Sequence, residues 1–340
     1  MVTYRDAGVD IEAGAKAVDL MKEAVQRTYG PEVLQGLGAF GGLFDVSDFK
    51  TMESPTLVAS TDGVGTKTKV ATAMGYFDTI GFDIVNHCVN DILVQGAKPL
   101  FFLDYVAASQ LDPEMIAAIV GGCAKACETI GCTLLGGETA EMPGVYADGE
   151  FDLVGTVVGV VDRAAIINGS RIEAGDRIIG LASSGLHTNG YSLARRVFAD
   201  QDWQETHPSL RQSLGEALLT PHRSYLPQVS DLQKAGIDIR GLAHITGGGL
   251  FENPPRILPD GIAAVIERES WPVPAIFQML QVQGQIDEAE MMQAFNMGLG
   301  MLCVLPAGQV DDALQILGDD AWLVGETTAQ QTGDGVVQVR

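Results

Sequence analysis

The chain has 340 residues, more than one domain usually holds, so we expect two domains of roughly 100–200 residues each. Asp and Glu outnumber Lys and Arg by 44 to 21. The formal charge of −23 argues against nucleic acid or an anionic membrane as a partner, because both require basic patches. The sequence shows no secretory signal pattern and no apolar run of about 20 residues, which predicts a cytoplasmic protein that does not enter membranes.

Apolar periodicity and turn residues predict a mixed order of helices and strands in the first half. In chain order these are helix 11–29, strand 56–60, helix 78–95, strand 100–108, helix 112–130, strand 133–137 and strand 152–161. The segment NGSRIEAGD at 168–176 has the composition of a linker. It predicts a boundary near residue 170, which gives domains 1–170 and 171–340.

The second half repeats the mixed pattern, and the predicted fold class is therefore α/β in the broad sense (α+β). Its predicted elements are strand 177–182, helices near 191–200, 224–235, 273–282 and 310–317, and strands 262–266 and 301–305. The five cysteines form no CxxC pair, and this favours reduced, buried thiols over a zinc site.

The stretch STDGVGTKT follows the first predicted strand and carries the parts of a phosphate site. Gly63 and Gly65 let the backbone approach an anion, Lys67 would neutralise phosphate charge, and Asp62 would hold a hard cation. Thr66 separates the second glycine from the lysine, so the stretch is not a Walker A loop. The residues predict a nucleotide-triphosphate site on a fold other than that of the P-loop enzymes.

A second glycine-rich stretch, GLGAFGG, matches the pattern GxGxxG over 36–41. A dinucleotide site requires a strand before this pattern and a helix after it, and neither is predicted here. We therefore favour a loop that covers phosphates through glycines such as Gly38 and Gly41, or a mobile turn.

The helix predicted at 78–95 has an apolar arc and an opposite polar arc. The polar arc comprises Asp83, Asn86, His87, Asn90 and Asp91. A solvated face is the ordinary explanation, but such faces favour Lys, Glu and Arg over these poor helix formers. Because short side chains with oxygen atoms suit Mg²⁺ and its bound water, we favour a binding face.

The motif GGETAEMPG places Glu138 and Glu141 near the end of strand 133–137. Taken alone, it is typical of a capped turn. Ligands gather beyond the carboxyl ends of strands in open α/β sheets. We therefore predict that both glutamates join Asp62 and Asp91 in a cluster of metal-binding carboxylates.

Glycine-rich turns after apolar strands carry polar residues in the second half. SSGLHTNGY contains His187 and Asn189, and HITGGG begins with His244. Loops after strands commonly carry binding groups, so functional and structural roles are both open for these histidines. His207 and His222 receive a structural interpretation.

Together these motifs resemble those of the phosphoribosylformylglycinamidine cyclo-ligases, the aminoimidazole ribonucleotide synthetases of purine biosynthesis. The resemblance covers essentially the whole chain. It rests on DAGVDI, GLGAFGG, DGVGTK, CVNDILVQGAKPLFFLDY, GGETAEMPG, SSGLHTNGYSL, HITGGG and FNMGLG. The pattern D-x4-G-A-x-P that begins at Asp91 is shared with a wider superfamily of ATP-using enzymes, whereas GGETAEMPG and HTNGYSL narrow the resemblance to the cyclo-ligases.

The resemblance implies an ATP-dependent ring closure of formylglycinamidine ribonucleotide to aminoimidazole ribonucleotide, with release of ADP and phosphate. It implies a C-terminal α/β domain and N-terminal sheets that pair into a barrel in a homodimer. The residues that it places at ATP are Gly38, Gly41, Asp62, Gly63, Gly65, Thr66, Lys67, Asn90, Asp91 and Glu138. Its Mg²⁺ ligands are Asp62, Asp91, Glu138 and Glu141. The residues implied in catalysis or substrate binding are Lys67, His187, Asn189, His244, the turn 246–249 and Asn296.

Other members of the superfamily and one other class are the alternatives. Selenophosphate synthetase places a reactive Cys or selenocysteine in its N-terminal glycine-rich region, but the first cysteine here is Cys88. Thiamine-phosphate kinases lack the GGETAEMPG and HTNGYSL stretches. A catalytically silent dimeric nucleotide-binding protein is the alternative from another class, and the complete set of carboxylates together with Lys67 argues against it.

Overall fold

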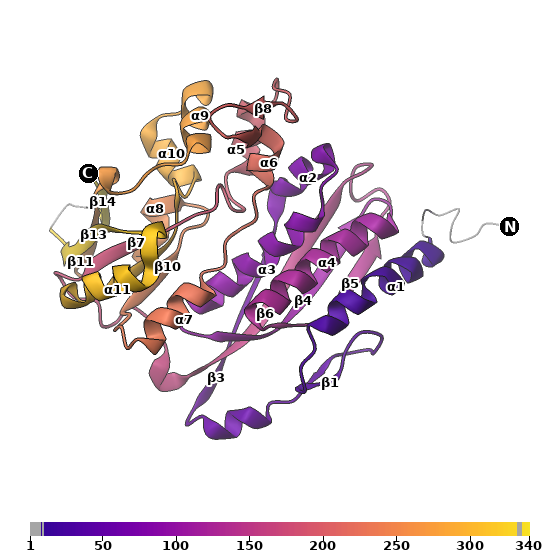
Figure 1. Cartoon of the computed structure of the whole chain (residues 1–340), viewed down its shortest axis with the longest axis horizontal. Helices are drawn as coiled ribbons and strands as arrows, with labels where there is room; N and C mark the ends of the chain where they lie inside the picture. The colour runs from indigo at the N-terminus through magenta and orange to yellow at the C-terminus, as the bar shows by residue number, and fades with distance from the viewer. Residues whose placement is uncertain (1–7, 9, 332–334) are drawn as a thin grey trace. The chain divides into compact units, whose positions relative to one another are not determined.

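The computed structural model describes residues 8, 10–331 and 335–340, and the chain divides into two compact units. The first unit comprises the residues up to Ile92 together with Ala97–Ala165. The second comprises Leu93–Gly96 and Ile166–Arg340. Figure 1 shows helices and strands mixed in both units, as the sequence predicts.

The first unit is built on a four-stranded mixed sheet. Its strands, in spatial order, are β3 (Pro55–Gly63), β6 (Phe151–Asp162), β4 (Lys98–Ala108) and β5 (Thr133–Glu141). The β3–β6 and β6–β4 pairs are antiparallel, and the β4–β5 pair is parallel. The sheet is therefore mixed. Strands β3 and β5 continue past their predicted ends, so the acidic motifs lie within strands instead of in loops.

Three helices cover one face of this sheet: α1 (Ile11–Arg27), α3 (Asp78–Leu93) and α4 (Pro113–Ile130) (Figure 1). Helices α3 and α4 approach each other closely at a pair of glycines. A Cβ atom on Gly81 would lie 2.2 Å from a backbone atom of α4, and one on Gly122 would lie 2.1 Å from a backbone atom of α3. A larger residue at either position would push the helices apart.

The opposite face of the sheet carries exposed apolar side chains. The pairing register places Leu57 of β3 and Leu103 of β4 on this face, where they are 63% and 37% exposed.

The glycine-rich loop connects the short strands β1 (Val33–Gln35) and β2 (Leu43–Phe44), which pair with each other.

The second unit contains a six-stranded sheet. Its strands, in spatial order, are β10 (Gly241–His244), β12 (Leu299–Leu305), β7 (Arg177–Ala182), β13 (Ala321–Ala329), β11 (Ile262–Ile266) and β14 (Val337–Val339). Adjacent side chains of β12 enter different core layers. Met301 belongs to the same core cluster as Val229 of helix α7 (Leu226–Lys234), whereas Leu302 belongs to the cluster that contains Trp271.

The remaining α-helices and β-strands are short. They are helices α2 (Thr68–Met74), α5 (Tyr191–Val197), α6 (Leu214–Leu219), α8 (Gly249–Glu252), α9 (Ala275–Gly284), α10 (Glu288–Ala294) and α11 (Val310–Leu317), and strands β8 (Thr206–His207) and β9 (Gln212–Ser213). Within the described ranges, every helix is too short or too polar to cross a bilayer.

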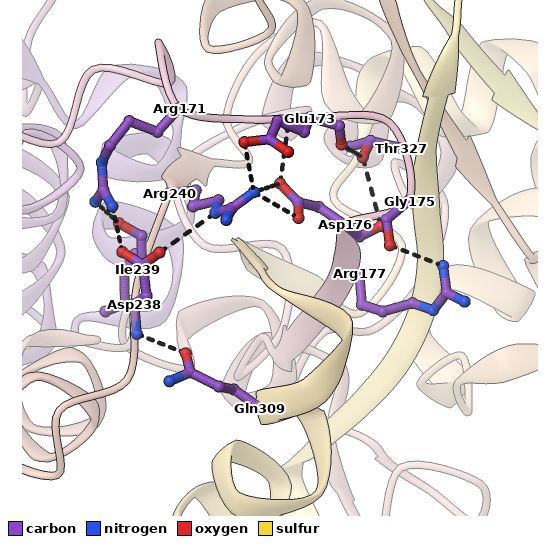
Figure 2. A network of polar contacts seen from close by, with 10 residues as sticks. All are labelled: Arg171, Glu173, Gly175, Asp176, Arg177, Asp238, Ile239, Arg240, Gln309 and Thr327. Carbon is purple, nitrogen blue, oxygen red and sulfur yellow. Dashed lines mark hydrogen bonds and ion pairs between the residues drawn. The ribbon is translucent and has the colours of Figure 1, made fainter.

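Arg240 is the centre of a polar network near the start of the second unit (Figure 2). Its guanidinium donates to both carboxylate oxygens of Asp176, at 3.0 and 3.1 Å, and to Asp238 at 3.3 Å. Arg171 also pairs with Asp238. The segment 168–176, predicted as a linker, is therefore an anchored part of the unit, because Arg171 and Asp176 form ion pairs with residues elsewhere in it.

Candidate active site

Two of the predicted carboxylates meet at a histidine in the first unit. The Nε2 atom of His87 lies 2.9 Å from Asp62 Oδ2 and 3.6 Å from Asp91 Oδ2. Asp91 also accepts a hydrogen bond from the Ser60 hydroxyl at 3.1 Å. His87 is buried, whereas the side chains of Asp62 and Asp91 are 44% and 28% exposed. The histidine holds the two carboxylates together while leaving them within reach of a ligand.

These groups alter one another's ionisation. Burial disfavours a charge on His87, but the hydrogen bond to Asp62 and the nearby carboxylates outweigh it and raise the pKa of His87. Burial also works against an ionised Asp62, yet the bond and charge of His87 lower the pKa of Asp62 overall. Ionised carboxylate oxygens are the ligands that Mg²⁺ prefers, so the chemistry of this pair fits Mg²⁺.

The polar arc of α3 is a buried stripe and not a solvated face. Asp83, His87 and Asp91 are spaced four residues apart, so they share one side of the helix. His87 and Asp91 contact β3, and Asp83 pairs with Lys67 in the short 3₁₀ turn η3 (Gly65–Lys67). The buried members of the arc are Asp83, Asn86, His87 and Asn90.

Lys67 occupies a position that differs from the predicted phosphate contact. Its Nζ atom lies 2.8 Å from Asp83 Oδ1, and both side chains are fully buried. Burial lowers the pKa of Lys67, and the charge of Asp83 offsets only part of this effect. The accessible part of the motif is formed by exposed Gly65 and by half-buried Gly63 and Thr66. Lys67 therefore supports the turn from beneath.

The strand register places Asp62 in one row with Gly155, Asp104 and Gly137, on the side of the sheet that the helices cover. Asp104 is buried, and burial raises its pKa to about 7. Beside Asp104 lies a cavity of about 280 Å³ with apolar walls from α1 and α4. Asp104 is absent from the predicted site residues. Its one sequence signal is a single acidic residue inside an apolar strand.

Glu138 does not join Asp62 and Asp91, contrary to the prediction. It lies on β5, three strand spacings from β3, which corresponds to roughly 14 Å. Alternation along β5 also turns it to the uncovered face of the sheet. It lines a hollow of about 400 Å³ together with Gly38 and Gly41 of the glycine-rich loop, and it also borders the cavity beside Asp104. The predicted cluster is divided because the motif continues a strand instead of forming a loop.

Glu141 has a structural position. Its Oε2 atom accepts a hydrogen bond from the Asp10 amide at 2.6 Å, and Oε1 accepts one from the Leu111 amide at 2.9 Å. These bonds hold the start of α1 against the segment before α4. Because both oxygens serve backbone amides, we leave Glu141 out of the proposed metal ligands.

Three histidines come together in the second unit: His187, His222 and His244. The His187 and His222 rings stack with their centroids 4.0 Å apart, and His222 Nε2 lies 3.0 Å from His244 Nε2. All three are buried, and His187 has a φ of 61°, which non-glycine residues rarely adopt. The structural interpretation of His222 is incomplete, since this residue contacts both histidines for which a functional role was open.

The two predicted asparagines flank this cluster in different ways. A Cβ atom on Gly247 would lie 3.3 Å from Asn189 Oδ1, so Asn189 approaches the HITGGG turn. Asn296 is buried, accepts a hydrogen bond from the Ser183 hydroxyl at 3.0 Å and donates to the Gly185 carbonyl at 2.9 Å. Asn296 therefore stabilises the loop after β7.

Comparisons with known proteins agree on one family. Residues 46–161 match the model of "AIR synthase related protein, N-terminal domain", and residues 173–338 match the corresponding C-terminal domain. A phosphoribosylformylglycinamidine cyclo-ligase of Desulfitobacterium hafniense is 54% identical over 334 residues, which cover 97% of this chain and 98% of that protein. This chain belongs to the phosphoribosylformylglycinamidine cyclo-ligase family. A cyclo-ligase of Geotalea daltonii is 50% identical, with 99% of this chain and 98% of that protein covered. The resemblance found in the motifs is confirmed.

Solved structures establish the fold of this cyclo-ligase family member. Hydrogenase maturation protein HypE in complex with ATP matches with a TM-score of 0.71 and 18% identity, covering 98% of this chain and 93% of that one. Thiamine-monophosphate kinase from Stenotrophomonas maltophilia matches with a TM-score of 0.67 and 20% identity, covering 95% of each chain. The predicted two-part AIR-synthetase-like architecture is confirmed by these matches and by the domain models.

Proposed function

We propose that the chain catalyses the ATP-dependent closure of formylglycinamidine ribonucleotide to aminoimidazole ribonucleotide, with release of ADP and phosphate, in cytoplasmic purine biosynthesis. The observation that carries the proposal is the 54% identity to a cyclo-ligase over 97% of the chain. The carboxylate pair of the first unit supplies the independent chemical support, because it suits a magnesium–triphosphate complex.

The proposed reaction solves a leaving-group problem. An amide oxygen leaves poorly, so the formyl oxygen first attacks the γ-phosphorus of ATP, and ADP departs. The formamide nitrogen loses its proton, the amidine nitrogen attacks the formyl carbon, the carbon–oxygen bond breaks, and phosphate carries the oxygen away. The attacking nitrogen then loses a proton, and a proton moves from the ring CH₂ group to the exocyclic nitrogen to give the aromatic amine. Because both reacting groups belong to one molecule, holding that molecule folded supplies much of the acceleration.

We assign Asp62 and Asp91 to the Mg²⁺–ATP complex. Mg²⁺ bound by their oxygens would neutralise charge on the triphosphate. His87 sets the separation of the two carboxylates through its contacts of 2.9 and 3.6 Å. The exposed Gly65 allows a phosphate to approach the backbone closely, and Lys67 holds that turn in place.

We assign a second nucleotide surface to Glu138, Gly38 and Gly41. These residues line the hollow of about 400 Å³, which is open enough for part of a nucleotide.

We also propose a homodimer that covers the exposed apolar face of the first-unit sheet. Leu57 and Leu103 are 63% and 37% exposed on that face, and burial of such a patch favours association.

The test is a coupled assay with ATP, Mg²⁺ and formylglycinamidine ribonucleotide. Aromatic amine product and inorganic phosphate should appear in equal amounts, and no phosphate should appear without the ribonucleotide. Equal ATP hydrolysis with and without the ribonucleotide would count against the proposal. Phosphorylation of thiamine phosphate or selenide by the same preparation would assign the chain to another activity of the superfamily.

A further inference from the structure

His222 lies between two loops whose motifs the family resemblance implies in catalysis or substrate binding. Its Nδ1 atom is 3.4 Å from Thr188 Oγ1, in the loop after β7. Its Nε2 atom is 3.0 Å from His244 Nε2, at the end of β10. Its ring also stacks on that of His187 at 4.0 Å. The buried side chain of His222 therefore contacts Thr188, His187 and His244, which belong to the HTNG and HITGGG motifs.

The His222–His244 contact imposes a strict proton arrangement. Two imidazole nitrogens 3.0 Å apart form a hydrogen bond only when one carries a hydrogen and the other offers its lone pair. Two hydrogens between the rings would face each other in a buried site. The pair therefore holds one hydrogen between its rings, and this requirement fixes the orientation of both.

A metal site is the competing explanation for three clustered histidines, whose ligand atoms lie within 4.8 Å of one another. A metal needs one lone pair from each ring. The Nε2 atom of His187 accepts the Ser184 amide hydrogen at 3.1 Å, so in the neutral ring Nδ1 carries the hydrogen and neither nitrogen offers a lone pair to a metal. Two converging rings are fewer than the three or four protein ligands that zinc normally takes, so the geometry favours a hydrogen-bonded pair.

We propose that His222 is a positioning residue of the ring-closure reaction. Through Thr188 and His244 it holds the two motif loops at a fixed separation, and the acyclic ribonucleotide is folded between them. This inference rests on the proposed cyclo-ligase function. Displacement of a positioning group by about 1 Å can reduce turnover about 100-fold, so even a small movement of these loops matters.

The test compares His222→Leu, which removes both hydrogen bonds, with His222→Gln, whose amide can both donate and accept. We expect kcat for ring closure to fall about 100-fold in the leucine variant, while KM for ATP stays unchanged. The glutamine variant should recover most of the loss. His207→Gln is the matched control, because His207 bonds to Ser209 of its own turn, and it should behave as wild type.

Measurements besides activity separate positioning from folding. Circular dichroism should give the same spectrum for all variants, and ¹⁵N NMR of the wild type should show one imidazole hydrogen coupled to nitrogens of two rings. Wild-type kcat in His222→Leu, absence of that coupling, or one equivalent of metal that is lost in His222→Leu would each overturn the inference. A wild-type protein that lacks ring closure but shows the coupling would instead overturn the proposed function.

Discussion

The polar groups of the two units are arranged differently. In the first unit, His87 contacts the carboxylates of Asp62 and Asp91, and both carboxylates are partly exposed. In the second unit, His187, His222 and His244 are buried and contact one another. Charges are costly to bury, whereas neutral imidazoles can satisfy one another by hydrogen bonding. The first arrangement suits charge neutralisation, and the second suits orientation.

The same contrast exists within α3. His87 pairs with partly exposed Asp62, while Asp83 pairs with Lys67 at full burial. Because its carboxylate is partly exposed, Asp62 can exchange its contact with His87 for a contact with a ligand. The buried pair cannot do so without leaving an uncompensated charge, and it therefore serves the structure.

The largest effect is expected when one carboxylate beside His87 in the first unit loses its charge. Asp91→Asn should lower turnover about 1,000-fold, which corresponds to about 4 kcal/mol, because it removes a negative charge from the proposed metal site. The coupled assay measures the change. Asp19→Asn, at an exposed position of α1, should leave turnover unchanged. Normal activity of Asp91→Asn would remove Asp91 from the metal role.

Loss of the buried Lys67–Asp83 pair should affect chiefly the free energy of unfolding. Lys67→Met should lower the free energy of unfolding by about 3–5 kcal/mol, because Asp83 would keep a buried charge. The double change Lys67→Met, Asp83→Leu should recover much of this loss. Lys69→Met is the control, since Lys69 pairs with Glu150 at a 38% exposed position and should cost at most about 1 kcal/mol. Urea unfolding measures all three, and a fully stable Lys67→Met would refute the structural role.

Asp104 tests whether burial alone disfavours charge in the first unit. Its folded pKa of about 7 lies above the ordinary 3.8, so its favourable contribution is complete at low pH and is lost as pH rises from about 4 to 7. Asp104→Asn should therefore stabilise the protein at pH 8, by at most ~4 kcal/mol, and have little effect at pH 4. Thermal unfolding at both pH values checks this, and equal effects at both would contradict it.

The smallest expected effect is a shift in the pKa of His87 when its contact with Asp62 is removed. Asp62→Asn removes the strongest influence that raises the pKa of His87, so that pKa should fall. NMR titration of the five histidines can follow the change, with His207 as an internal reference. A His87 pKa that stays the same in Asp62→Asn would show that the 2.9 Å contact carries little electrostatic weight.

Local sequence patterns predicted the elements better than the ends of the strands. Strand β7 and helix α11 have their predicted bounds, because both patterns end at clear turn residues. Strands β3 and β5 extend through polar motifs, because pairing with β6 and β4 satisfies their backbone groups whatever the side chains are. That extension moved Glu138 away from the predicted carboxylate cluster.

The residue types of the site and the order of its motifs were decided by the sequence itself, and the resemblance of those motifs indicated the family, because a motif consists of neighbouring residues. Only the tertiary structure decided which polar groups meet. Lys67 and Asp83 are 16 residues apart, and His222 and His244 are 22 apart. Contacts of this kind depend on strand register and helix packing, which bring distant segments together and determine which charges lose their water.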